Sequence, residues 1–228
     1  MSMGTSSPVG KTFFCIDLDR TLFDTERGAN RMITIAEKED PTLGTFFKEY
    51  RTAYAGFGVA ISFYDTIVER AGEAVAQRVA RQYVAEGDEG LLLPQARNFM
   101  TALAEAVGKD WGILTYGSDS GQRLKIDAVG ISTIATLVTN EPHKGQLITS
   151  WIASDGFRLP REYGGGIYQR VVLVDDRLQS FEGLPDGAVG YWLTEEVTAL
   201  DEIPMPRHVI AVKTLDDVLR HEHIAPYN

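Results

Sequence analysis

Two carboxylates stand two residues apart at the end of an apolar run near the start of the chain. The run Phe13–Ile16 is followed by Asp17 and Asp19. A short apolar run without helical periodicity is typical of a strand that is buried on both faces. Two neighbouring negative charges cost free energy unless a cation or a shared proton offsets their repulsion. The pattern therefore predicts a site that binds a cation or shares a proton.

Hydroxyl, ammonium and carboxylate groups follow three later apolar runs. They are Thr115 after Ile113–Leu114, Lys144 in the loop after Leu137–Val138, and Asp175 with Asp176 after Val171–Val174. In an open parallel sheet, ligands bind outside the carboxyl ends of the strands, so we expect all these groups to lie together. Carboxylate oxygens suit Mg²⁺, and a lysine with a hydroxyl suits phosphoryl oxygens. A carboxylate beside the metal can also act as the nucleophile.

Strands and helices alternate from Leu91 onward, which predicts parallel βαβ units and a doubly wound α/β sheet. The expected strands are Trp111–Thr115, Ile134–Val138, Val171–Val174, Ala188–Leu193 and His208–Val212. The expected helices are one from about Pro94 to Gly108, then Ser118–Val129, Gly145–Ala153 and Leu215–His221.

The first strand is separated from the others by a segment with helical patterns and no convincing strand. Its expected helices are Arg27–Lys38, Thr42–Ala55, Ala60–Ala71 and Glu73–Glu86, with glycines and Pro41 between them. One Rossmann-like domain with a helical insertion explains this order. We expect residues 11–24 and 91–228 to form this domain and residues 25–90 to form the helical insertion, which the family resemblance described below identifies as a catalytic core and a cap.

Composition excludes several classes of protein. The 228 residues carry a net charge of −10 without a cluster of Lys and Arg, so no nucleic-acid partner is expected. The longest apolar runs are too short to cross a bilayer, and the polar N-terminus does not resemble a signal peptide. A single cysteine fits the cytoplasm. We expect a cytoplasmic protein without a membrane segment, and the oligomeric state stays open.

The four polar groups resemble, in order, the motifs of the haloacid dehalogenase-like hydrolase superfamily. The first motif is Asp17-Leu18-Asp19-Arg20-Thr21, and Thr115, Lys144 and Asp175-Asp176 match the other three. The resemblance covers nearly the whole chain. It implies a Rossmann-like sheet with strand order 5-4-1-2-3 and a helical cap inserted after the first motif.

The resemblance also implies a role for each motif residue. Asp17 would be the nucleophile and a Mg²⁺ ligand. Asp19 would protonate the leaving oxygen, activate water and offer its backbone carbonyl to the metal. Thr115 and Lys144 would bind phosphoryl oxygens, while Asp176 would bind the metal directly with Asp175 close behind it. The chain departs from the family pattern at Arg20, where glycine is usual, at Tyr116, and at Gly145.

These implications favour a Mg²⁺-dependent phosphatase that hydrolyses a small phosphorylated metabolite through an aspartyl-phosphate on Asp17. A phosphomutase, a dehalogenase of the same superfamily and a non-catalytic regulatory protein are the alternatives. A dehalogenase needs neither Asp19 nor the pair Asp175-Asp176. A phospho-acceptor receiver module would place its lysine last, whereas here the acidic pair follows Lys144.

Other polar residues have structural interpretations or belong to the cap. Asp24 is expected to cap the first inserted helix, and Cys15 is expected to be an inert buried residue. Substrate specificity should reside in the cap. Its candidate residues are Arg27, Arg31, Arg51, Tyr54 and Tyr64.

Overall fold

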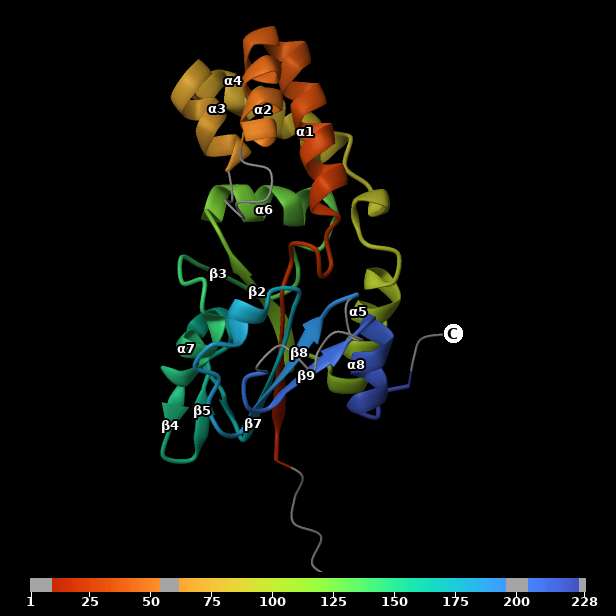
Figure 1. Ribbon diagram of the computed structural model, residues 1–228, viewed down its shortest axis with the longest axis vertical. Helices are drawn as coiled ribbons and strands as arrows, with labels where there is room; N and C mark the ends of the chain where they lie inside the picture. Colours follow the sequence, from red (N-terminus) through yellow and green to blue (C-terminus); the bar gives the residue numbers. More distant parts are fainter. Residues whose placement is uncertain (1–9, 54–61, 196–204, 226–228) are drawn as a thin grey trace, which may run out of the picture.

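A six-stranded parallel sheet forms the centre of the computed structural model, which describes residues 10–53, 62–195 and 205–225 (Figure 1). In spatial order the strands are β3 (Thr136–Thr139), β2 (Trp111–Tyr116), β1 (Thr12–Ile16), β7 (Arg170–Asp175), β8 (Ala188–Leu193) and β9 (Val209–Val212). The predicted order 5-4-1-2-3 corresponds to β8-β7-β1-β2-β3, and β9 extends the sheet beside β8. The predicted α/β fold is thereby confirmed.

Side chains of the central strands alternate between two apolar cores, one on each face of the sheet. Phe14 and Ile16 of β1 point into one core, while Phe13 and Cys15 point into the other. Strand β7 follows the same alternation. Burial on both faces explains why these strands read as continuous apolar runs rather than as alternating ones.

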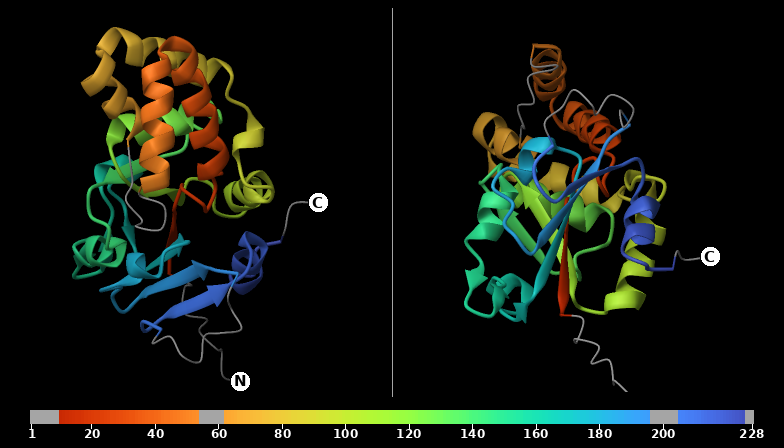
Figure 2. Two further views of the ribbon diagram at one scale, coloured as in Figure 1. Left: turned by 45° about the horizontal axis from the view of Figure 1, so that its top comes forward. Right: turned by 60° about the horizontal axis from the view of Figure 1, so that its bottom comes forward.

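Helices cover both faces of the sheet, as Figure 2 shows. Helices α5 (Ala96–Val107) and α8 (Leu215–His221) pack together on one face, and α7 (Lys144–Thr149) lies on the other. The short helix η3 (Leu178–Phe181) contacts α7 and β7. Helix α5 ends at Gly108, as predicted, where a left-handed φ of 61° stops the helix. Within the described residues, no helix is both long and apolar enough to span a membrane.

Four helices follow β1 and lie beyond the carboxyl ends of the strands (Figure 1). They are α1 (Thr25–Glu39), α2 (Pro41–Ala53), α3 (Phe63–Ala71) and α4 (Glu73–Ala85), followed by the short helix η1 (Glu89–Leu91). Asp24 caps α1, as predicted, because its side chain accepts a hydrogen bond from Arg27 N at 2.9 Å. Tyr54 and the predicted break at residues 56–58 lie outside the described residues.

Helix α6 (Asp119–Ala128) contacts both the inserted helices and the sheet. It packs against α3 and α4 on one side and against β3 on the other. Ser118 caps the helix through a hydrogen bond from Gly121 N at 3.1 Å. This helix therefore lies between the inserted helices and the sheet and contacts both.

A small antiparallel sheet follows α7 and was not predicted. It contains β4 (Ile152–Ala153), β5 (Gly156–Arg158) and β6 (Ile167–Tyr168), with the short helix η2 (Arg161–Tyr163) between the last two. The predicted helix Gly145–Ala153 is wrong after Thr149. The Ser150 hydroxyl donates to the Leu147 carbonyl at 2.6 Å and competes with continued helix. The predicted strand Ile134–Val138 begins later, at Thr136.

A buried ion pair attaches the C-terminal helix to the sheet. Glu222, directly after α8, accepts from Arg170 Nη2 of β7 at 2.6 Å and from the Tyr191 hydroxyl of β8. Burial raises the pKa of Glu222, but the hydrogen bonds from Arg170 and Tyr191 outweigh it and hold that pKa below its usual value. The Glu222 side chain is only 7% exposed, so water replaces these partners poorly.

We expect Glu222→Gln to lower the free energy of unfolding at pH 7 by about 1–3 kcal/mol, because a buried charge-assisted hydrogen bond is lost. Urea denaturation measures this difference. The pKa of Glu222 is depressed, so its contribution is complete above about pH 5 and declines as the pH falls through the folded-state pKa. Glu49→Gln, at an exposed position of α2, is the matched control. A difference that persists unchanged well below pH 4 would contradict the ion-pair interpretation.

Candidate active site

Two aspartates and a lysine from separate elements form a buried ionic cluster at the carboxyl ends of β1 and β7. Asp17 directly follows β1 and Asp175 ends β7, and these two strands pair with Ile16 beside Val174. The Lys144 ammonium, at the first position of α7, donates to Asp175 Oδ2 at 2.6 Å and also to Asp17 Oδ1. All three side chains are at most 7% exposed. The structure thus brings together three residues predicted from separate motifs.

Lys144 remains an ammonium in this cluster. Burial lowers its pKa, but the charges of Asp17 and Asp175 outweigh that effect and raise the pKa above its usual value. A buried cation between two carboxylates is the arrangement that makes burial of all three groups possible.

Asp176 completes a group of three carboxylates with Asp17 and Asp175. Candidate ligand atoms of the three residues lie within 4.8 Å of one another. Burial, followed by the charge of Asp175, raises the pKa of Asp176 to about 6. Burial also raises the pKa of Asp17, and the charge of Lys144 only partly opposes it. Three carboxylates with a single ammonium are short of positive charge, and their oxygens fit a hard divalent cation such as Mg²⁺.

Thr115 lies in β2 beside β1, where the motif order predicts it. Its side chain is fully buried, and its Oγ1 has no hydrogen-bond partner among the described residues. The hydroxyl of Thr21, from the first motif, is also buried and has no hydrogen-bond partner among the described residues. Buried hydroxyls without a hydrogen-bond partner are uncommon, because burying a hydroxyl without a hydrogen bond costs about 1–3 kcal/mol. Both hydroxyls therefore have hydrogen-bonding capacity for a ligand.

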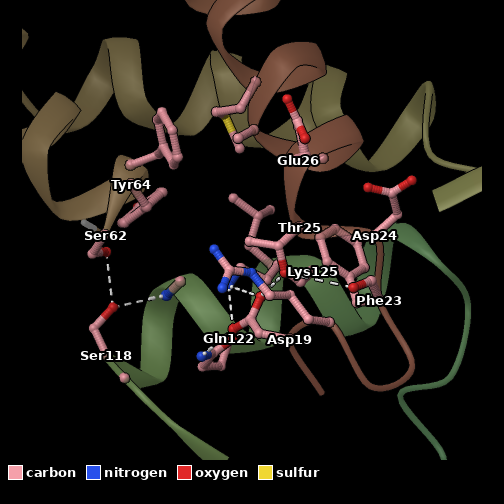
Figure 3. A pocket seen from close by; sticks show the side chains of 18 of the residues that line it. Asp19, Phe23, Asp24, Thr25, Glu26, Ser62, Tyr64, Ser118, Gln122 and Lys125 are labelled. Carbon is pink, nitrogen blue, oxygen red and sulfur yellow. Dashed lines mark hydrogen bonds and ion pairs between the residues drawn. The ribbon is translucent and has the colours of Figure 1, made fainter. Parts of the chain in front are cut away.

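Asp19 lies apart from the cluster and is held by three side chains that the sequence analysis missed (Figure 3). Lys125 Nζ donates to both of its carboxylate oxygens at 2.7 Å. Gln122 Nε2 donates at 2.9 Å and the Thr25 hydroxyl at 2.8 Å. Burial raises the pKa of Asp19, but Lys125 and the hydrogen bonds outweigh it and lower that pKa.

The sequence contains a pattern that could have identified two of the three side chains that bind Asp19. Gln122 and Lys125 are three residues apart, so they share one face of the helix predicted over Ser118–Val129. That helix follows the Thr115 strand, and its first turns lie beside the strand ends. Polar residues on its inner face were therefore candidates for the site.

A pocket of about 890 Å³ lies between the inserted helices and the strand ends. Asp19 is the predicted site residue that lines this pocket. The wall at the strand ends also includes Arg20, Tyr116, Asn140 and Arg177. The opposite wall carries aromatic and apolar side chains, among them Met32, Tyr50, Phe63, Tyr64 and Tyr83.

The predicted cap residues divide into two groups. Arg51 and Tyr64 line the pocket. Arg27 instead donates to the Gly90 carbonyl and Arg31 to the Glu86 carbonyl, and neither is part of the pocket wall. Tyr54 lies outside the described residues.

Two side-chain hydrogen bonds join the inserted helices to α6 on one side of the pocket, and Figure 3 shows the one between Ser62 and Ser118. The Ser118 hydroxyl donates to Ser62 Oγ at 2.8 Å, and the Ser120 hydroxyl donates to Asp65 Oδ1 at 2.6 Å. Ser62 caps α3, so this contact fixes the start of that helix against α6.

We expect Lys125→Met to lower the free energy of unfolding by about 1–3 kcal/mol, because it leaves the mostly buried Asp19 carboxylate without its cation. Urea denaturation measures the loss. In a double-mutant cycle, Asp19→Asn should remove most of it, since the two side chains then no longer form a charge pair. Arg123→Met, on the exposed side of the same helix, is the control and should change stability by less than about 0.5 kcal/mol. Additive effects of the two variants would show that the pair does not contribute.

Comparison with known proteins identifies the fold. No family model matches the sequence, and no curated protein matches it. A haloacid dehalogenase-like hydrolase from Burkholderia xenovorans matches in structure with a TM-score of 0.58 and 16% identity, covering 93% of this chain and 97% of the other. An L-2-haloacid dehalogenase matches with a TM-score of 0.51 and 15% identity, covering 93% and 99%.

A third similar structure is a hydrolase of the haloacid dehalogenase (HAD) family from Deinococcus radiodurans. That structure contains bound phosphate and sodium. It matches with a TM-score of 0.51 and 13% identity, covering 94% of this chain and 97% of the other. Near-complete coverage in both directions shows a common fold. The chain has the fold of the haloacid dehalogenase-like hydrolases, as the resemblance of its motifs predicts.

Proposed function

We propose that the protein is a Mg²⁺-dependent phosphatase that hydrolyses a small phosphomonoester through a covalent intermediate on Asp17. The observation that carries this proposal is the buried cluster of Asp17, Lys144 and Asp175 with Asp176 beside it. Displacement of a halide requires a nucleophilic carboxylate but not a second and third one. A phosphoryl group brings negative oxygens, which need a metal ion and an ammonium group.

Asp17 is the nucleophile in this proposal. Lys144 binds its Oδ1, and its Oδ2 has no hydrogen bond to any described residue. Oδ2 attacks phosphorus, the P–O bond to the leaving group breaks, and the leaving oxygen takes a proton. Water then attacks the aspartyl-phosphate, which releases phosphate and regenerates the carboxylate. Lys144 and the Thr115 hydroxyl hold the phosphoryl oxygens.

The metal would be held by Asp17, Asp176 and the Asp19 carbonyl, with Asp175 close by. When bound, it supplies positive charge that stabilises the transferring phosphoryl group. The carboxylate cluster fits such an ion because its charge is not otherwise balanced. A related hydrolase of this fold from Bacillus subtilis, which matches with a TM-score of 0.50, 12% identity and coverage of 94% and 99%, is bound to magnesium.

Asp19 serves as the acid and base in this proposal. It lies on the pocket wall, two residues from Asp17, where a leaving group would sit. Lys125, Gln122 and Thr25 fix the direction of its carboxylate. In its protonated form Asp19 gives its proton to the leaving oxygen and becomes a carboxylate, which then accepts a proton from the attacking water and is restored. Lys125 and the hydrogen bonds favour the carboxylate form that the second step needs.

We also propose that two parts of the chain have different functions, one in catalysis and the other in substrate selection. Residues 11–24 and 91–228 form the catalytic core, and residues 25–90 form a cap that selects the leaving group. The pocket supports this division, because its walls come from both parts. The substrate is a small phosphorylated metabolite.

We expect Asp17→Asn to reduce hydrolysis of para-nitrophenyl phosphate by at least about 10³-fold, because the amide is a poor nucleophile. Release of nitrophenol measures the rate, and circular dichroism checks the fold. Asp155→Asn, in the exposed turn between β4 and β5, should retain full activity. Undiminished hydrolysis by Asp17→Asn would exclude the covalent mechanism.

We expect a chelator to abolish hydrolysis and added Mg²⁺ to restore it. Asp176→Asn should raise the Mg²⁺ concentration required for half-maximal activity by at least about tenfold, because it removes a ligand. Titration of activity against Mg²⁺ measures this shift. Chelator-insensitive release of halide from a haloacid would instead favour the dehalogenase.

A further inference from the structure

Two arginines on the pocket wall lack the partners that other pocket cations have. Arg20 lies in the loop after β1 and Arg177 in the loop after β7. Within the described residues, neither guanidinium group forms a hydrogen bond or a close ion pair. Lys125 is bound to Asp19, and Arg51 contacts Asn30 and Glu26. The positive charges of Arg20 and Arg177 are therefore available to a ligand in the pocket.

The backbone of Arg20 adopts a conformation that arginine rarely takes. Its φ is +59°, in the left-handed region that glycine enters at no steric cost. The Arg20 N–H donates to the Phe23 carbonyl at 2.9 Å, so the turn itself requires this geometry. The side chain is exposed, so packing does not compensate for the strain. Strain retained at a pocket wall points to a function for the side chain.

The fold places the loop of Arg177 beside the loop of Arg20. Strands β1 and β7 pair in parallel, so the loops that follow them leave the sheet side by side. The Arg177 N–H donates to Asp175 Oδ1 at 2.8 Å, which anchors its loop to the buried cluster.

We propose that Arg20 and Arg177 form a second anion subsite, which binds a negative group on the leaving part of the substrate. This inference rests on the proposed function, in which Lys144 and Thr115 hold the transferred phosphoryl group. The ligand class is a phosphomonoester that carries a carboxylate or a second phosphate. Guanidinium groups bind both anions through paired hydrogen bonds. The pocket of about 890 Å³ is large enough for such a molecule.

Binding to the Asp17→Asn variant tests the subsite without turnover. Calorimetry in the presence of Mg²⁺ compares phenyl phosphate with 3-carboxyphenyl phosphate, 4-carboxyphenyl phosphate and 1,4-phenylene bisphosphate. We expect at least one probe with a second anion to bind about tenfold more tightly than phenyl phosphate, because a charge-assisted hydrogen bond is gained. The carboxylate and bisphosphate probes distinguish the two sources of the anion.

Arg20→Gly and Arg177→Met, each added to Asp17→Asn, should reduce this preference to within about twofold and leave the affinity for phenyl phosphate unchanged. Arg20→Gly removes the left-handed strain, so its melting temperature should not fall. Arg123→Met, outside the pocket wall, is the matched control and should keep the preference.

Equal affinities for all four probes, or no binding of any, would overturn the subsite. An equal loss of affinity for every probe in the arginine variants would also overturn it, since the arginines would then serve the transferred group. Failure of the wild-type protein to hydrolyse any probe is a separate result. It contradicts the proposed phosphatase, while a second-anion preference that depends on the arginines still supports the subsite.

Discussion

The ammonium of Lys144 between two buried carboxylates is the interaction on which the rest of the site depends. Asp17 and Asp175 end neighbouring parallel strands, so the sheet itself forces their charges together. Lys144, from a third element, offsets that repulsion in a place that water hardly reaches. The sheet register and the position of α7 are thus coupled through one side chain.

The sequence predicts the part of the structure that follows from strand periodicity and from strand ends. Asp17, Thr115 and Asp175 each end or follow an apolar run, and parallel strands bring such ends to one edge whatever the details of packing. The pairing register then places Asp17 beside Asp175, with Thr115 one position further along the neighbouring strand β2. The gathering of these groups could therefore be foreseen from one chain. Their catalytic roles remain predictions.

Other features could not be predicted, for physical reasons. Strands β4 and β6 have two residues each, which is too short for any periodicity to appear. The contacts of Lys125 and Gln122 with Asp19 depend on how α6 is rotated against the strand ends, and helical spacing alone does not determine this rotation. Likewise, the left-handed backbone of Arg20 follows from a turn that closes through Phe23.

Helix α6 supports two parts of the site at once. Its N-cap Ser118 and its first-turn Ser120 are hydrogen-bonded to the start of α3, and its second turn carries the lysine that holds Asp19. A short helix transmits displacement along its axis with little bending. A displacement of the start of α3 would therefore shift the side chain that orients the Asp19 carboxylate, which couples the position of the inserted helices to the direction of that carboxylate.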